Sequence, residues 1–186
     1  TLTCLLRELG MARVHEIELN EVPKDIQNIY REYSTNYGPF INQVKVFAQR
    51  PPALKHIMGM LLEMDKEALI PKRYLEIGVI VVSRLNQCDY CVDHHTPRLL
   101  VEGFSQETVD RILEEDCPGL DELDQLVRDL AIQVTHTPAN IPEKVFDGLR
   151  NHFTDPQIVE LVLRISLCGF FNRFNDALQI ENELKG

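Results

Sequence analysis

Apolar side chains recur at intervals of three and four residues along most of the chain, the spacing that gathers them on one face of a helix. One such run consists of Ile26, Ile29, Tyr30 and Tyr33. Longer runs over residues 120–134 and 158–168 keep the same period. Many of these runs begin just after a proline, whose missing N–H costs nothing in the first turn of a helix. The pattern predicts an all-α protein of eight or nine helices.

Residues 77–82 are the one stretch that fits this pattern poorly. They read Ile-Gly-Val-Ile-Val-Val, and by propensity alone such β-branched residues predict a buried strand. A strand followed by a helix that starts at a CxxC would resemble thioredoxin. However, Pro71 suits the first turn of a helix, apolar positions 75, 79, 82 and 85 keep helical spacing, and the chain offers no convincing partner strand. We therefore predict a buried helix over 71–86.

Several helix ends can also be placed. Ser105 is a good cap for a short helix through 112–113, and Gly103 is suited to end the helix before it. Pro138 is expected to stop the helix that contains 120–134. Thr154 and Gln157 form a capping box for a helix that continues to about residue 183.

The domain organisation is expected to be simple. A chain of 186 residues has the length of about one domain, and no linker rich in Gly, Ser or Pro divides it. Residues 1–22 are the least regular part, in which Val14, Ile17 and Leu19 suit a short extended arm. We predict an N-terminal arm or extension over 1–22 and one helical domain over 23–186.

Charge and cysteine content limit the classes of function that the chain can have. The chain has 19 Lys and Arg against 29 Asp and Glu, a net charge of −10, so a nucleic-acid partner is not expected. The longest apolar stretches fall well short of the roughly 20 residues that a membrane span needs. Five cysteines cannot all pair within one chain, and the start shows no signal-peptide pattern. We expect a cytoplasmic, reducing setting, in which neighbouring cysteines serve chemistry or metal binding.

The candidate chemistry lies in Cys88-Asp-Tyr-Cys91 and the histidines that follow. In a helix that starts near residue 89, Cys88, Cys91 and His95 lie on one stripe, because they are three and four residues apart. A helix N-terminus and a nearby imidazole both favour a thiolate. His94 points about 100° away around the helix, so we interpret it as a neighbour or surface residue rather than the base.

Glu76 precedes His95 by 19 residues, with Asn86 midway. If two antiparallel helices meet near Asn86, Glu76 and His95 are equally far from the turn and lie side by side. Burial in this apolar run is expected to raise the pKa of Glu76 and suit it to a proton relay with His95. The alternative is a simple ion pair of Glu76 with Arg73 or Arg84.

The four residues Glu76, Cys88, Cys91 and His95 match in spacing the active-site signature of the alkylhydroperoxidase D-like (AhpD-like) branch of the carboxymuconolactone decarboxylase-like superfamily. The resemblance covers about residues 20–184 and implies an AhpD-like helical bundle with the CxxC at the start of a helix. It further implies a homo-oligomer, either a dimer, trimer or hexamer. The family prototype has a histidine where this chain has Tyr90.

The resemblance also implies a thiol peroxidase without cofactor or metal. Cys91 would attack the hydroperoxide, Cys88 would donate a proton and close the disulfide, and Glu76 and His95 would relay protons. An external dithiol, dihydrolipoyl or thioredoxin-like, would reduce the site again. Three alternatives stay open: a general disulfide oxidoreductase, a carboxymuconolactone decarboxylase-like enzyme, and a zinc or redox-sensing module that uses the same four side chains. The other cysteines have no partner at ligand spacing; they are Cys4, Cys117 and Cys168.

Overall fold

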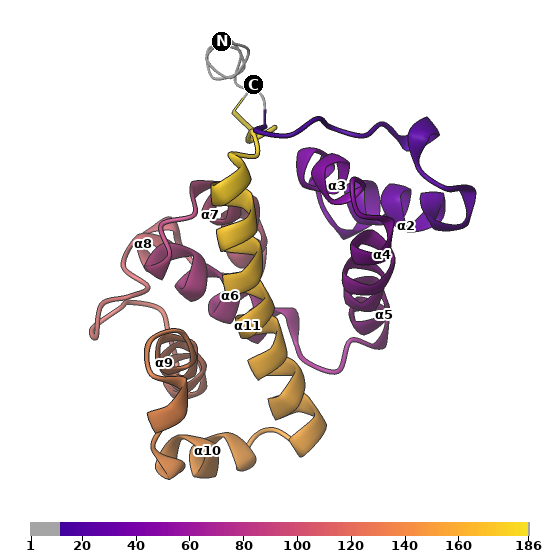
Figure 1. Cartoon of the computed structure of the whole chain (residues 1–186). Coiled ribbons are helices and arrows are strands. Elements are labelled where there is room, and N and C mark those ends of the chain that lie inside the picture. The colour runs from indigo at the N-terminus through magenta and orange to yellow at the C-terminus, as the bar shows by residue number, and fades with distance from the viewer. Residues whose placement is uncertain (1–11, 186) are drawn as a thin grey trace. The chain divides into compact units, whose positions relative to one another are not determined.

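The computed structural model describes residues 12–185 (Figure 1). Every regular element within that range is helical, and the range contains no strand. The expected all-α class is therefore confirmed, and the thioredoxin-like alternative is wrong. None of the helices within the range is both long and apolar enough to cross a bilayer.

The described residues group into two compact units, one of 12–68 with 174–185 and one of 69–173. The predicted division into 1–22 and 23–186 stays a prediction. The first unit contains short helical pieces and the last turn of the long helix α11, Asp155–Leu178. Its elements are the 3-10 turns η1 (Leu19–Glu21) and η2 (Lys24–Ile26), the π-helical segments η3 (Tyr33–Tyr37) and η4 (Leu54–Met58), and the helices α2 (Gln27–Glu32), α3 (Ile41–Phe47), α4 (Pro51–Ala53) and α5 (Gly59–Glu67).

Within the first unit, residues 12–18 before η1 form no helix or strand, and Leu19 belongs to η1 rather than to an extended arm. The backbone N–H of Ile17 donates to the carbonyl oxygen of Lys45 at 3.1 Å, and that of Arg13 donates to Leu178 at 2.8 Å. The part of the expected arm in residues 1–11 lies outside the described residues.

The second unit contains the elements that position the candidate site. They are α6 (Lys72–Leu85), α7 (Asp89–Val101), α8 (Gln106–Asp110), α9 (Glu122–His136), the 3-10 turn η5 (Pro138–Asn140), α10 (Glu143–Arg150) and α11 up to residue 173. Helix α6 packs against both α7 and α9. Every residue of α6 from 75 to 83 is buried, which explains why a helix here is as rich in β-branched residues as a strand. The predicted helix over 71–86 is confirmed.

Helix ends agree with the sequence prediction in most places. The Ser105 side chain accepts from the N–H of Thr108 at 3.1 Å, although α8 ends at Asp110, earlier than expected. Helix α9 ends just before Pro138. Helix α11 ends at Leu178 rather than near 183, because Gln179 adopts a left-handed conformation with φ of 51° and closes the helix.

The turn between α6 and α7 fixes the start of the CxxC motif. Gln87 has a φ of 57°, its N–H donates to the Arg84 carbonyl at 3.2 Å, and the Cys88 N–H donates to the Ser83 carbonyl at 3.0 Å. This pair of bonds is the Schellman motif, which ends α6 within three residues. Cys88 can therefore serve directly as the N-cap residue of α7.

Candidate functional site

Cys88 and Cys91 form a close pair of free thiols. The Cys88 Sγ donates a hydrogen bond to the Cys91 Sγ at 2.8 Å. Cys88 is fully buried and Cys91 is 5% exposed, so Cys91 is the more accessible of the two. Cys91 lies in the first turn of α7, where backbone N–H groups have no helical partner and the helix dipole favours negative charge. Cys91 is thus the thiol that lies inside the first turn of α7, and Cys88 is its N-cap residue.

Glu76 and His95 lie side by side, as the midpoint argument predicts. The Glu76 Oε2 atom is 2.7 Å from His95 Nδ1. The alternative partners of Glu76 are engaged elsewhere, since Arg73 pairs with Asp124 and Arg84 pairs with Asp110. An ion pair of Glu76 with an arginine is therefore present, but its partner is Arg98 rather than Arg73 or Arg84.

Two other arginines approach Glu76, and the sequence analysis missed both. Arg98 Nη1 lies 3.5 Å from Glu76 Oε1. Arg164, buried on α11, also acts on the Glu76 carboxylate through its charge. Arg98 follows His95 by three residues on α7, so helical spacing could have revealed it. Nothing in the local pattern points to Arg164.

His95 and, to a smaller extent, the two arginines reverse the expected pKa shift of Glu76. Burial raises the pKa of this carboxyl, but the charges of His95, Arg98 and Arg164 and the His95 hydrogen bond together hold its pKa below the usual value. For His95, burial lowers the pKa and outweighs the opposing effect of Glu76. At neutral pH the pair is therefore a carboxylate beside a neutral imidazole.

This charge state determines the tautomer of His95. An ionised carboxylate can only accept a hydrogen bond, so His95 Nδ1 carries the proton and donates to Glu76 Oε2. The other ring nitrogen, Nε2, is then unprotonated and can act as a base. Glu76 is thus suited to orient the imidazole and stabilise its charged form, rather than to carry the proton itself.

His94 is buried, so of the two placements expected for it, a neighbour of the site or a surface residue, the surface position is wrong. Its Nδ1 lies 2.7 Å from the Tyr90 carbonyl oxygen, and its ring stacks on the Tyr90 ring with centroids 4.1 Å apart. Tyr90 occupies the position where the family prototype has histidine. Here that position holds an aromatic ring against which His94 packs.

A buried polar cluster supports the turn behind Cys88. The Asn86 side chain donates to Asn172 Oδ1 at 2.9 Å, and Asn172 donates to Ser83 Oγ at 3.3 Å. Cys168 is 3.3 Å from Ser83 Oγ, and burial raises the pKa of its thiol to about 12. Cys168 is thus part of the core.

The remaining cysteines do not join the site. Cys117 is buried, and its thiol donates to the Thr108 carbonyl at 3.5 Å. Burial raises the pKa of this thiol as well. Cys4 lies outside the described residues.

Two further observations concern possible metal and ligand sites among the described residues. Among residues 12–185, no group of three or more His, Cys, Asp and Glu side chains is placed to bind one metal ion. A pocket of about 250 Å³ lies between α6, α9 and α11, with Val82, Asn86 and Arg173 in its lining, and the four predicted residues do not line it.

Comparison with known proteins relates this geometry to a family. Residues 51–119, which include α6, α7 and the dithiol, match the carboxymuconolactone decarboxylase family model. The chain is 25% identical over 138 residues to the uncharacterized protein YdfG of Bacillus subtilis (strain 168), covering 73% of this chain and 93% of YdfG.

Solved structures share the fold over almost the whole chain. A peroxidase-related protein from Ralstonia eutropha JMP134, described as an alkylhydroperoxidase AhpD core, has a TM-score of 0.78 at 24% identity and 94% coverage of both chains. The debrominase Bmp8, solved as an alanine variant in complex with 2,3,4-tribromopyrrole, has a TM-score of 0.74 at 19% identity and 91% coverage of both.

Proposed function

We propose that this chain, whose residues 51–119 match the carboxymuconolactone decarboxylase family model and whose fold is AhpD-like, is a thiol-dependent peroxidase that reduces organic hydroperoxides. One observation carries the proposal. Cys88 donates to Cys91 across 2.8 Å at the start of α7, with the Glu76–His95 pair one turn further along. A nucleophile, a resolving thiol and a base are thus held together.

In the first step, Cys91 is the nucleophile. His95 Nε2 takes the Cys91 thiol proton, and the thiolate attacks the terminal oxygen of the hydroperoxide. The sulfur–oxygen bond forms as the O–O bond breaks, and the leaving alkoxide takes the proton from His95 to become an alcohol. Cys91 is oxidised to a sulfenic acid.

In the second step, Cys88 resolves the sulfenic acid. Its sulfur attacks the Cys91 sulfur, the S–O bond breaks, and the departing hydroxide takes the Cys88 proton to leave as water. A disulfide of about 2.05 Å requires the two sulfurs to approach by less than 1 Å from their separation of 2.8 Å. The local backbone therefore needs little rearrangement.

An external dithiol completes the cycle. It reduces the Cys88–Cys91 disulfide by thiol–disulfide exchange and is itself oxidised to a disulfide. The net reaction converts one hydroperoxide and one dithiol into one alcohol, one water and one disulfide. We propose a dihydrolipoyl or thioredoxin-like donor for this role.

Mass spectrometry tests the proposal directly. Treatment of the reduced protein with one equivalent of cumene hydroperoxide should produce a Cys88–Cys91 disulfide, with loss of two hydrogen atoms from the protein and release of cumyl alcohol and water. Survival of both free thiols would exclude the mechanism. The matched control is Cys117→Ser, which should form the same disulfide because Cys117 takes no part.

A second experiment separates a peroxidase from a general disulfide oxidoreductase. In a Cys88→Ser variant the sulfenic acid on Cys91 cannot be resolved, so dimedone should label Cys91 after exposure to peroxide. A disulfide oxidoreductase without peroxide chemistry would show fast exchange with disulfides and no dimedone adduct.

A further inference from the structure

Two helices direct charged or ionisable groups at the buried Glu76 carboxylate. Glu76 lies on α6, His95 and Arg98 lie on α7, and Arg164 lies on α11. The four-residue signature includes only the first two. We propose that Arg98 is a positioning residue that keeps Glu76 ionised and His95 neutral. His95 Nε2 is then unprotonated and can accept the Cys91 proton. This role rests on the proposed function.

The contacts allow Glu76 to hold both α7 residues at once. His95 Nδ1 is 2.7 Å from Glu76 Oε2, and Arg98 Nη1 is 3.5 Å from the other oxygen, Oε1. His95 and Arg98 are three residues apart on one helix, so they occupy the same face. The Glu76 side chain is 9% exposed and that of Arg98 is 25% exposed, which keeps the contact only partly screened by water.

The Arg98 charge acts in the same sense on both partners. It favours the ionised form of Glu76 by attraction, and it disfavours the protonated form of His95 by repulsion. His94, beside His95 on α7, also opposes its protonation. Arg98 therefore supports the one arrangement in which Nδ1 donates to Glu76 and Nε2 is unprotonated.

Other charges near Glu76 do not replace this effect. Arg164 is a second cation, held on a different helix, and it remains in any Arg98 variant. Helix α9 also packs on α6, but its buried carboxylate, Asp124, is already paired with Arg73. Removing the Arg98 charge should therefore weaken, without abolishing, the preference for a neutral His95.

The test uses three variants of the full chain. Arg98→Met removes the charge and keeps most of the side-chain length, whereas Arg98→Lys keeps the charge. Arg111→Met is the matched control. Arg111 is similarly exposed, and its substitution changes the net charge by the same amount, but Arg111 pairs with Glu107, Glu114 and Asp116 rather than with Glu76. Arg98→Gln serves as a second neutral variant if the methionine variant does not fold.

Two readouts are measured as a function of pH: the ¹⁵N shifts of the His95 imidazole, assigned with His95→Gln, and the rate of cumene hydroperoxide consumption. In Arg98→Met the His95 titration and the acid limb of the rate should both move up by about half a pH unit or more. Arg98→Lys should restore most of the wild-type behaviour, and Arg111→Met should leave both readouts unchanged.

A His95 titration in Arg98→Met within about 0.2 units of wild type would overturn the proposal. An equal shift in Arg98→Lys would do the same, because the charge would then not be the cause. The NMR readout needs no turnover. An inactive wild-type protein would therefore refute the peroxidase while leaving the role of Arg98 to be decided by the titration.

Discussion

Glu76→Gln is the substitution that most directly tests the charge state of the site. It replaces a buried carboxylate with a neutral amide of nearly the same shape, so it changes charge and hydrogen bonding with little change in packing. Glu76 is 7% exposed, and its two oxygens contact His95 and Arg98. We expect the variant to fold with reduced stability at neutral pH.

The size of the loss follows from the contacts. A hydrogen bond to an ionised group contributes about 1.5–3 kcal/mol and a neutral one about 0.5–1.5 kcal/mol, so the His95 contact at 2.7 Å weakens by about 1–1.5 kcal/mol. The partly exposed contact with Arg98 adds about 0.5 kcal/mol. We expect a total loss of about 2 kcal/mol in the free energy of unfolding, or roughly 4–8 °C in Tm for a chain of this length.

The pH dependence gives the prediction its sign. The folded-state pKa of Glu76 is lowered, so its stabilising effect is fully present above the unfolded value of about 4.3 and is lost as pH falls through the folded pKa. The gap between wild type and Glu76→Gln should therefore persist from neutral pH down to about pH 5 and close at lower pH.

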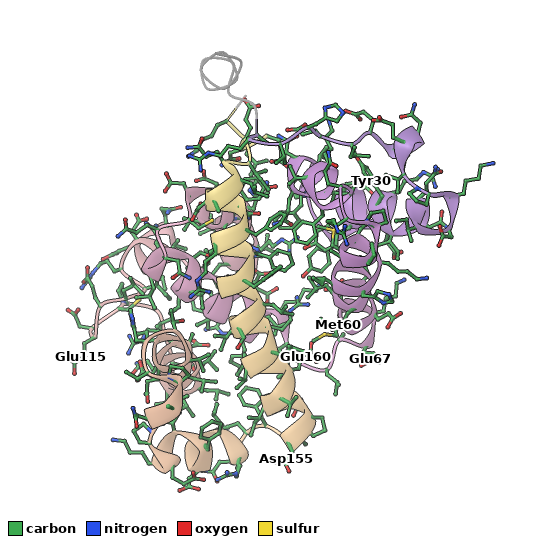
Figure 2. All side chains as sticks on the ribbon, viewed as in Figure 1. Tyr30, Met60, Glu67, Glu115, Asp155 and Glu160 are labelled. Carbon is green, nitrogen blue, oxygen red and sulfur yellow. The ribbon has the colours of Figure 1, made fainter. Side chains whose placement is uncertain are left out.

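Urea denaturation followed by circular dichroism measures this gap at each pH. The control is Glu115→Gln, because Glu115 is exposed and projects outward from the loop between α8 and α9 (Figure 2). That variant should match wild type within about 0.5 kcal/mol. Equal stability of Glu76→Gln and Glu115→Gln at neutral pH, or a gap that does not close in acid, would refute the reasoning.

Three further predictions follow from the same structure. Gln87 has a φ of 57°, so Gln87→Gly should stabilise the protein by about 0.5–1 kcal/mol and Gln87→Val should destabilise it. Thermal melts check both variants, and a higher Tm for Gln87→Val than for Gln87→Gly would contradict the turn geometry. Burial raises the pKa of the Cys168 thiol to about 12, so Cys168 should resist iodoacetamide at pH 8 in the native protein and react after denaturation. Labelling of the native protein, detected by mass spectrometry, would count against this. Burial lowers the pKa of His95, so the free energy of unfolding of the wild type should decline as pH falls below about 6.5. In urea titrations His95→Gln should show a smaller decline. Equal dependence of the unfolding free energy on pH in both proteins would argue against a buried neutral imidazole.

The sequence predicts the centre of the site because the relevant spacings are local. Residues 71–86 keep helical spacing despite their β-branched composition, and the structure confirms the helix. Glu76 and His95 are equally distant from Asn86, so an antiparallel turn at that point brings them to 2.7 Å. Both arguments need only the geometry of two helices and the turn that joins them.

The surroundings of the site could not be predicted in the same way. The Glu76 pKa is lowered in part by the charge of Arg164, which lies on a helix far along the chain. The end of α11 was missed because Gln179, rather than a glycine, adopts the left-handed conformation. Such features depend on which long side chain reaches which partner, and helical periodicity carries no information on that.

The central claim is that Cys91 reduces hydroperoxides with electrons that a dithiol supplies through Cys88. The most direct measurement is the steady-state consumption of cumene hydroperoxide with a dihydrolipoyl donor, comparing wild type with Cys91→Ser and with the control Cys117→Ser. Wild type and Cys117→Ser should turn over and release cumyl alcohol, and Cys91→Ser should fall to the rate without protein. Turnover by Cys91→Ser equal to wild type, or none by wild type, would contradict the account.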